Sequence, residues 1–157
     1  MVIAALIGSV GEGFASDLPP CDQSSDFWDN CFGKYTYKNG DRYEGEFVNG
    51  NMEGKGEYKF SNGNIYIGEW KEDQSHGSGE YTFKNGNTYV GEFRNGKRDG
   101  DGKFIYPDGE KYEGGYKNGK KEGFGVFSEC CAKICIFGEE RVERLIGKCA
   151  EFIFYRV

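Results

Sequence analysis

The chain has 157 residues, enough for one domain, and a net charge of −6. Its 26 glycines are more than twice the number that average usage gives, whereas 13 Phe, 11 Tyr and 2 Trp supply too much ring area for a disordered linker. The composition therefore indicates an ordered, turn-rich β protein and excludes a helical one. Because the charge gives no broad positive field, we predict no nucleic-acid partner.

Residues 1–16 are predicted to be a secretory signal peptide. The first ten residues contain no charged side chain, and the small residues Gly13 and Ala15 suit cleavage after Ala15. No Lys or Arg precedes this apolar run, which leaves a second interpretation open: an apolar strand or helix that packs on the sheet. The run is too short to cross a bilayer as a helix. We expect a secreted or periplasmic protein, the alternative being a cytoplasmic, membrane-associated one.

Residues 17–33 are predicted to cap the N-terminal end of the sheet. Cys21 and Cys31 lie in this segment, before the regular pattern of the chain begins. In an oxidising compartment a disulfide between them closes a short loop, a prediction that agrees with export. The alternative is a pair of free thiols in the cytosol.

Residues 34–127 repeat with a period of 23. The sequences YEGEF, YIGEW, YVGEF and YEGGY begin at Tyr43, Tyr66, Tyr89 and Tyr112. Rings alternate with polar residues in each, as in a strand with one buried face, and Asn-Gly or Asp-Gly pairs suited to tight turns lie between the strands. Each unit is therefore predicted to be a β-hairpin, and neighbouring hairpins are predicted to pair into one long meander.

Glycines at fixed positions are predicted to make room for the rings. If every inward position carried a ring the face would be overfilled, so a glycine two residues after each tyrosine lets that ring lie across the backbone. The predicted repeat framework consists of Tyr43, Gly45, Tyr66, Gly68, Trp70, Tyr89, Gly91, Phe93, Tyr112 and Gly114.

The order Tyr-x-Gly-Glu-Trp/Phe, a glycine turn and then Gly-x-Gly resembles the MORN repeat, in four full units over residues 43–127 and a partial one from Cys31. Three departures occur: Cys31 replaces a glycine, Gly115 replaces a glutamate, and Glu72-Asp73 replaces Asn-Gly, which predicts a differently shaped loop around His76. The resemblance implies an elongated, twisted, single-layer antiparallel sheet. It also implies protein–protein contact, self-association or attachment near membranes, with phospholipid binding often proposed for such repeats.

Residues 128–157 depart from the repeat. Residues 139–149 have apolar side chains at helical spacing, which predicts a short amphipathic helix over the open end of the sheet. The cysteines of this tail are Cys130, Cys131, Cys135 and Cys149. Their spacing differs from that of zinc ribbons, which favours disulfides or buried thiols over zinc.

Catalytic and metal sites are not predicted. His76, the one histidine, is placed in a loop beside Ser75 with no identifiable third group, which favours a surface residue. Glu46, Glu69 and Glu92 recur in every unit, whereas an active site needs a single constellation, so they are predicted to accept hydrogen bonds from turn amides or to pair with lysines. We expect no cofactor.

Two Lys-rich turns form the candidate basic patch. Lys97, Arg98, Lys120 and Lys121 occupy matching places in successive units and are expected to cluster along one edge, in solvated turns. They are candidates for contact with an anionic phospholipid. The alternative is a set of solvated charges balanced by Asp99 and Glu122.

Together these features predict a non-enzymatic repeat scaffold that presents an aromatic face and basic turns to an unidentified protein partner, with self-association open. The alternatives are a phospholipid-binding surface module and an accessory domain of a catalytic protein.

Overall fold

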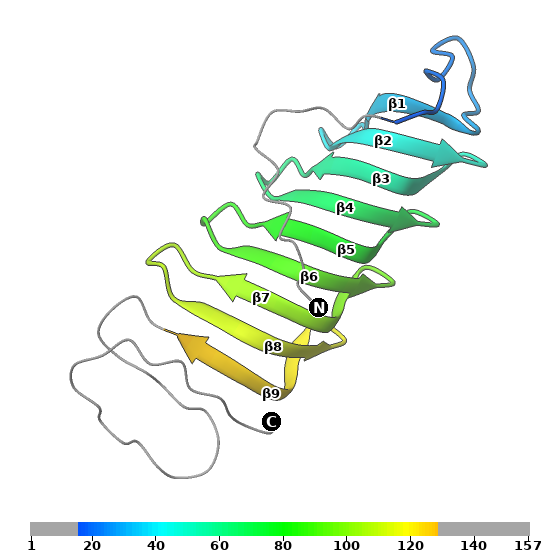
Figure 1. Cartoon of the computed structure of the whole chain (residues 1–157). Coiled ribbons are helices and arrows are strands. Elements are labelled where there is room, and N and C mark those ends of the chain that lie inside the picture. Colours follow the sequence, from blue (N-terminus) through cyan, green and yellow to red (C-terminus); the bar gives the residue numbers. More distant parts are fainter. Residues whose placement is uncertain (1–15, 129–157) are drawn as a thin grey trace, which may run out of the picture.

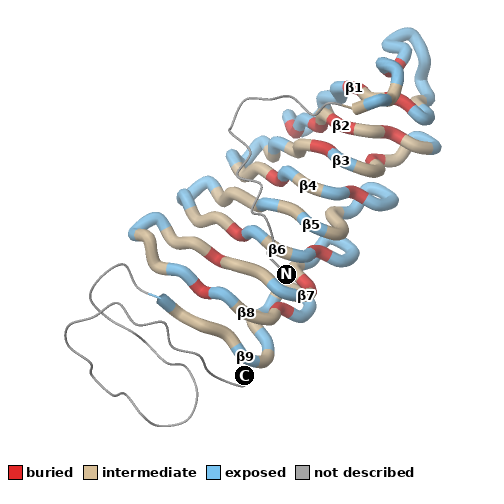
Figure 2. The backbone as a smooth tube through the Cα atoms, in the orientation of Figure 1, coloured by how far each residue is buried: buried red, intermediate tan, exposed pale blue. Residues whose placement is uncertain are grey.

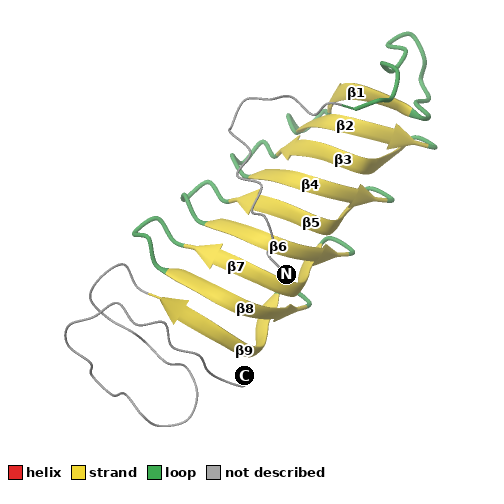
Figure 3. Cartoon of the chain, in the orientation of Figure 1, coloured by secondary structure: helices red, strands yellow, loops and turns green. Residues whose placement is uncertain are grey.

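The computed structural model describes residues 16–128, which form a single open sheet of nine antiparallel strands in chain order (Figure 1). The strands are β1 (Cys31–Thr36), β2 (Arg42–Val48), β3 (Asn51–Lys59), β4 (Ile65–Lys71), β5 (Gln74–Thr82), β6 (Thr88–Arg94), β7 (Lys97–Ile105), β8 (Lys111–Lys117) and β9 (Lys120–Ser128). The described residues contain no helix, and the predicted all-β meander of hairpins is confirmed (Figure 3). Residues 1–15 of the predicted signal peptide (residues 1–16) and the tail from residue 129, with its predicted helix and four cysteines, lie outside the described residues.

The sheet is one layer deep, elongated and twisted, and its strands stack side by side along the long axis (Figure 1). Every extensive strand contact joins two strands that are consecutive in the chain. Short turns lie along one long edge of the sheet, and longer turns lie along the other (Figure 3). Residues one repeat apart in the sequence therefore occupy equivalent places on strands that are two apart in the sheet.

The short-turn edge is built from two-residue turns. The pairs Asn49-Gly50, Asn95-Gly96 and Asn118-Gly119 all have positive φ at both residues, the conformation that matches the twist of the flanking strands. Glu72 (φ 48°) and Asp73 (φ 64°) adopt the same conformation. The expectation of a different loop here is wrong, because the surrounding hairpin imposes the turn that Asn-Gly adopts more easily.

Neighbouring turns on this edge are hydrogen-bonded to one another. The second turn residue donates its N–H to a carbonyl oxygen in the previous repeat: Asp73 to Met52 (3.2 Å), Gly96 to Ser75 (3.0 Å) and Gly119 to Arg98 (2.9 Å). The same bond occurs once more at the N-terminal end, from Gly50 to the carbonyl of Trp28 (2.7 Å). Each turn is thus held by the unit that precedes it.

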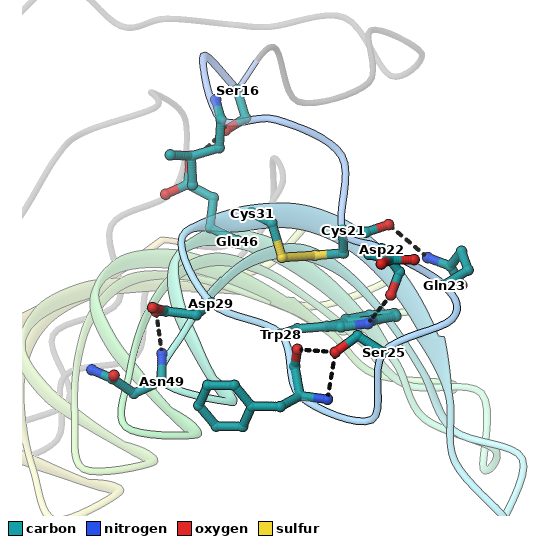
Figure 4. The surroundings of a disulfide bond; sticks show 12 residues. Ser16, Cys21, Asp22, Gln23, Ser25, Trp28, Asp29, Cys31, Glu46 and Asn49 are labelled. Carbon is teal, nitrogen blue, oxygen red and sulfur yellow. Dashed lines mark hydrogen bonds between the residues drawn. A yellow bond between two sulfur atoms is a disulfide. The ribbon is translucent and has the colours of Figure 1, made fainter.

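The N-terminal cap imitates a missing repeat. Besides the Trp28 carbonyl, the Asp29 carboxylate accepts the N–H of Asn49 (2.8 Å), so both residues of the first turn are held from the cap (Figure 4). Cys21 and Cys31 form a disulfide with Cα atoms 4.9 Å apart, and both are buried. The cap therefore replaces the contacts that a further unit would make with the first strands.

One face of the sheet carries the core, and we call it the ring-bearing face. Buried stretches recur along the sheet (Figure 2), and Tyr43, Tyr66 and Tyr89 are the largest fully buried side chains. Their hydroxyls donate to the carbonyls three residues on, at 3.1, 2.9 and 3.0 Å respectively. The rings form an almost continuous series of edge-on and tilted contacts, such as Tyr66 with Trp70 at 5.1 Å.

The predicted glycine sockets match the geometry. A Cβ on Gly68 would lie 2.6 Å from the Gly79 Cα and 2.7 Å from the Tyr66 hydroxyl oxygen. Gly91 and Gly114 meet the same obstacles from Tyr89 and Tyr112. Paired glycines on adjacent strands therefore provide the space in which each tyrosine ring lies.

Candidate binding groove

A groove of about 590 Å³ opens on the ring-bearing face between β3 and β7. Rings form much of its wall, including Tyr66, Trp70, Tyr81 and Phe93. Ser75 lies in the groove, and Asp73 and Arg98 also line it. This volume is in the range of sites that bind small molecules or partner side chains.

The groove opens because one position of the repeat varies. Met52, Ser75, Arg98 and Lys121 occupy equivalent positions, and each is paired across the short turn with a ring: Phe47, Trp70, Phe93 and Tyr116. We call these four residues the variable column. Three members have long side chains, whereas Ser75 is small. The groove opens beside Ser75, where Trp70 and Phe93 are buried and Tyr81 and Phe83, which also line it, are half-buried.

Arg98 lies over the rings and not in a solvated turn. Its guanidinium carbon is 5.5 Å from the Tyr89 ring centre, 5.8 Å from Phe104 and 5.2 Å from Tyr116, and the side chain is half-buried. One Nη donates to the Gly119 carbonyl at 2.7 Å. Arg98 thus combines cation–π contacts with a tie to the next turn.

Lys121 makes the equivalent arrangement one repeat later. Its Nζ lies 4.1 Å from the Tyr112 ring centre, with Tyr106 and Phe127 at 5.8 and 5.7 Å, and it donates to the Tyr106 hydroxyl at 3.4 Å. The prediction that all four basic residues lie in solvated turns is therefore wrong for Arg98 and Lys121. Lys97 and Lys120 are exposed at the starts of β7 and β9, in matching places beside the turns.

Two of the recurrent glutamates accept hydrogen bonds, but from a strand N–H and a serine hydroxyl and not from the predicted turn amides or lysines. The Glu69 carboxylate accepts the N–H of Ser78 at 3.1 Å, and that of Glu46 accepts the Ser16 hydroxyl at 3.4 Å (Figure 4). His76 is not in a loop: it lies in β5, half-buried and opposite Glu69. Strands after the short turns begin directly at the turn, which the sequence pattern did not reveal.

Polar ties join successive repeats on the long-turn edge. The Asp41 carboxylate accepts the Ser61 N–H (2.7 Å) and the Tyr58 hydroxyl (2.8 Å), and these bonds, the N–H first, lower the pKa of Asp41 to about 2. Asn64 repeats the tie, accepting from Lys84 N–H (2.9 Å) and donating to the Tyr81 hydroxyl (2.8 Å).

A buried carboxylate ties the repeats on the short-turn edge. Asp99 accepts the Asn118 N–H (3.2 Å) and the Lys117 ammonium (3.1 Å). The Asn118 bond and then the Lys117 bond hold the pKa of Asp99 below its usual range. The carboxylates of lowered pKa near the turns thus serve the framework.

Several tyrosines on the ring-bearing face are held neutral. Burial raises the pKa of Tyr89 to about 12 and raises the pKa of Tyr66 and Tyr116 as well.

Among residues 16–128, no group of three or more His, Cys, Asp and Glu side chains is arranged to hold a metal ion. The same residues contain no helix long and apolar enough to cross a bilayer.

Comparison with known proteins identifies the repeat. The MORN repeat family matches residues 32–42, 43–65, 66–88, 89–111 and 112–128, which agrees with the hairpin boundaries of the sheet. No curated protein matches the chain. The matched segments run without a gap over most of the chain, and the protein therefore belongs to the MORN repeat family.

Proposed function

We propose that this protein is a non-catalytic scaffold that binds a protein partner in the groove of its ring-bearing face. The observation that carries the proposal is the groove of about 590 Å³ opened by Ser75 in a column of otherwise long side chains. The half-buried rings of Tyr81 and Phe83 line it together with the buried rings of Trp70 and Phe93, and aromatic residues are enriched at protein interfaces. MORN repeats occur in scaffolds that contact proteins or membranes, which agrees with this use.

The test blocks the groove without altering the framework. Ser75→Met places there the side chain that the column carries at Met52, and Val90→Met introduces the same side chain at an exposed site on the opposite face. In affinity capture from the native source, quantified by mass spectrometry, proteins retained by the wild type should be retained by Val90→Met and lost with Ser75→Met. Identical capture by all three proteins would contradict the proposal.

A phospholipid-binding surface is the second candidate, favoured by the exposed, matching positions of Lys97 and Lys120. Each exposed cation near an anionic surface contributes about 1 kcal/mol to membrane binding. Lys97→Gln with Lys120→Gln should then abolish sedimentation with phosphatidylserine vesicles, and Lys120→Gln alone, outside the groove lining, should leave capture of proteins unchanged. Vesicle binding that survives both substitutions would rule these lysines out as the contact.

We propose also that the protein is exported. The buried Cys21–Cys31 disulfide supports this, because disulfides persist in oxidising compartments. Mature protein from the native source should begin near Ser16, and its migration on gels should change with reductant. An N-terminus at Met1 together with free thiols at both positions would overturn export.

A further inference from the structure

We propose that the segment bound in the groove is an acidic polyproline-II helix lying along the long axis of the sheet, with an apolar side chain at Ser75 and carboxylates at Arg98 and Lys121. The inference rests on the proposed function and specifies the chemistry of its partner. It assigns separate roles to three members of the variable column: an apolar notch followed by two cations.

The spacing of the column selects the conformation of the partner. Consecutive members are two strands apart, and since strands are spaced by ~4.8 Å they recur every ~9.6 Å. A polyproline-II helix has three residues per turn and rises ~3.1 Å per residue, so every third side chain points the same way at ~9.3 Å intervals. Positions i, i+3 and i+6 of such a segment therefore face Ser75, Arg98 and Lys121.

Other regular conformations fit the column less well. In an extended strand, side chains three apart point to opposite sides, so they cannot all face the groove. An α-helix presents residues seven apart at ~10.5 Å and drifts out of step by nearly 1 Å at each repeat. Aromatic grooves also suit polyproline-II segments, which lose little entropy on binding.

The two cations are available to carboxylates. No ion pair joins Arg98 or Lys121 to a carboxylate within residues 16–128, whereas Lys34, Lys103 and Lys117 are all paired. The guanidinium of Arg98 has five donors, and one hydrogen bond, to Gly119, engages it among these residues. Rings beneath both cations fix their positions, so a carboxylate meets a preorganised charge.

The charges along the groove determine the order in which the partner's apolar and acidic residues follow one another. Asp73 lines the groove on the side away from Lys121 and accepts the Met52 N–H at 2.8 Å. A carboxylate in the partner is repelled at that end and attracted at Arg98. The apolar anchor therefore belongs at Ser75, against Trp70 and Phe93, and the acidic positions follow toward β9.

The experiment uses labelled proline-rich peptides and fluorescence anisotropy with the whole chain. The test peptide carries a leucine and then glutamates three and six positions later, made in both chain directions. One control has the same composition with the glutamates two and four positions after the leucine, and a second is an alanine-rich helix with seven-residue spacing. The test peptide should bind at least ~10-fold more tightly than either control in one of its directions.

Matched substitutions locate the contact. Arg98→Gln and Lys121→Gln should each weaken binding of the test peptide by about 10-fold, whereas Lys120→Gln, next to Lys121 but exposed and outside the groove lining, should change it by less than about 2-fold. If Arg98→Gln unfolds by circular dichroism, Arg98→Lys replaces it: the charge remains, the two-point contact is lost, and an intermediate loss is expected.

Three results would overturn the inference: equal binding of the rearranged peptide, tighter binding of the helical peptide, or equal losses in the Lys120→Gln control. Binding of phosphatidylserine vesicles that depends on Arg98 and Lys121, with no peptide bound, would assign these cations to a membrane instead. If no peptide binds but Ser75→Met still abolishes protein capture, the acidic motif is wrong and the scaffold function stands. If capture is also unaffected by Ser75→Met, both proposals fall.

Discussion

The first two full repeats, residues 43–88, and the last two, residues 89–128, share one framework but are joined by different interactions. In the first pair, Asn64 bonds the Tyr81 hydroxyl and the Lys84 N–H. The equivalent residue at the junction between the two pairs is Asn87, and there Phe104, which has no hydroxyl, and Pro107, which has no N–H, occupy the positions of Tyr81 and Lys84. In the second pair, cation–π contacts of Arg98 and Lys121 lie across the rings instead. Repeats of equal shape thus differ in chemistry where a partner can bind.

The largest expected effect tests the framework that both halves share. Gly68→Ala and Gly91→Ala should each destabilise the fold by about 3 kcal/mol, because the new Cβ would lie within 2.7 Å of backbone atoms of the next strand. Gly96→Ala, with open space and φ +75°, should cost only about 1 kcal/mol. Chemical denaturation followed by circular dichroism measures all three. A cost at Gly91 no larger than at Gly96 would contradict the socket.

The next effect separates the junction inside the first pair, at Asn64, from the junction between the two pairs, at Asn87. Asn64→Ala leaves the Tyr81 hydroxyl and the Lys84 N–H without this partner and should cost about 1–2 kcal/mol, whereas Asn87→Ala should stay within about 0.5 kcal/mol. Denaturation midpoints give the comparison. In a Phe104→Tyr background, which restores the hydroxyl, Asn87→Ala should become costly. Equal losses of stability in Asn64→Ala and Asn87→Ala would show that the two junctions depend equally on this side chain.

A smaller effect concerns the hydroxyl of Tyr116, which is buried and has no hydrogen-bond partner among the described residues. Tyr116→Phe should stabilise the fold by about 1 kcal/mol, because the equivalent position of the previous repeat is Phe93 and the polar group is removed. The control Tyr89→Phe loses the bond to the Glu92 carbonyl and should destabilise by a similar amount. Thermal unfolding distinguishes the signs, and destabilisation in both variants would refute the assignment.

The smallest expected effect is the loss of folding stability in acid that comes from Asp41, which bonds the Ser61 N–H. The pKa of Asp41 is lowered, so its ionisation stabilises the fold above the unfolded value of ~4, and this contribution is lost as pH falls through about 2. Asp41→Asn should therefore be less stable at neutral pH, and its difference from the wild type should shrink between pH ~4 and ~2. Carboxyl titration by NMR provides the direct measurement. A midpoint near 4 for Asp41 would contradict this tie.

Periodic features of this chain could be predicted from the sequence, because the same contact recurs in every unit. The 23-residue period, the hairpins and the glycine sockets at Gly68 and Gly91 all follow from columns of identical residues. Arg98 and Lys121 were misplaced because their Lys-rich surroundings resemble turns. The column itself held the missing signal: Met52 occupies the same position, and an apolar residue there indicates the buried face.

A cap closed by Cys21 and Cys31 could be predicted, but its imitation of a repeat could not. The turn whose N–H bonds the Trp28 carbonyl follows Trp28 one residue later in the chain than the turns bonded by Met52, Ser75 and Arg98 follow them. The repeat period therefore does not reveal that Trp28 takes the same role as these residues. Its role comes from a backbone carbonyl, which any residue type supplies. The groove likewise results from one small residue, Ser75, among large ones, and only its packing against neighbouring rings shows the space that it leaves.

The single-layer order of the sheet also determines how the protein responds to force. Each strand pairs only with the strands before and after it in the chain, so the hydrogen-bonded ladders lie in series, every ladder carries tension applied between the ends of the sheet, and the weakest ladder opens first. The ladders open in sequence, and extension proceeds in steps of one strand. The sheet therefore unfolds strand by strand under load, and each strand can pair with its neighbour again when the load is released.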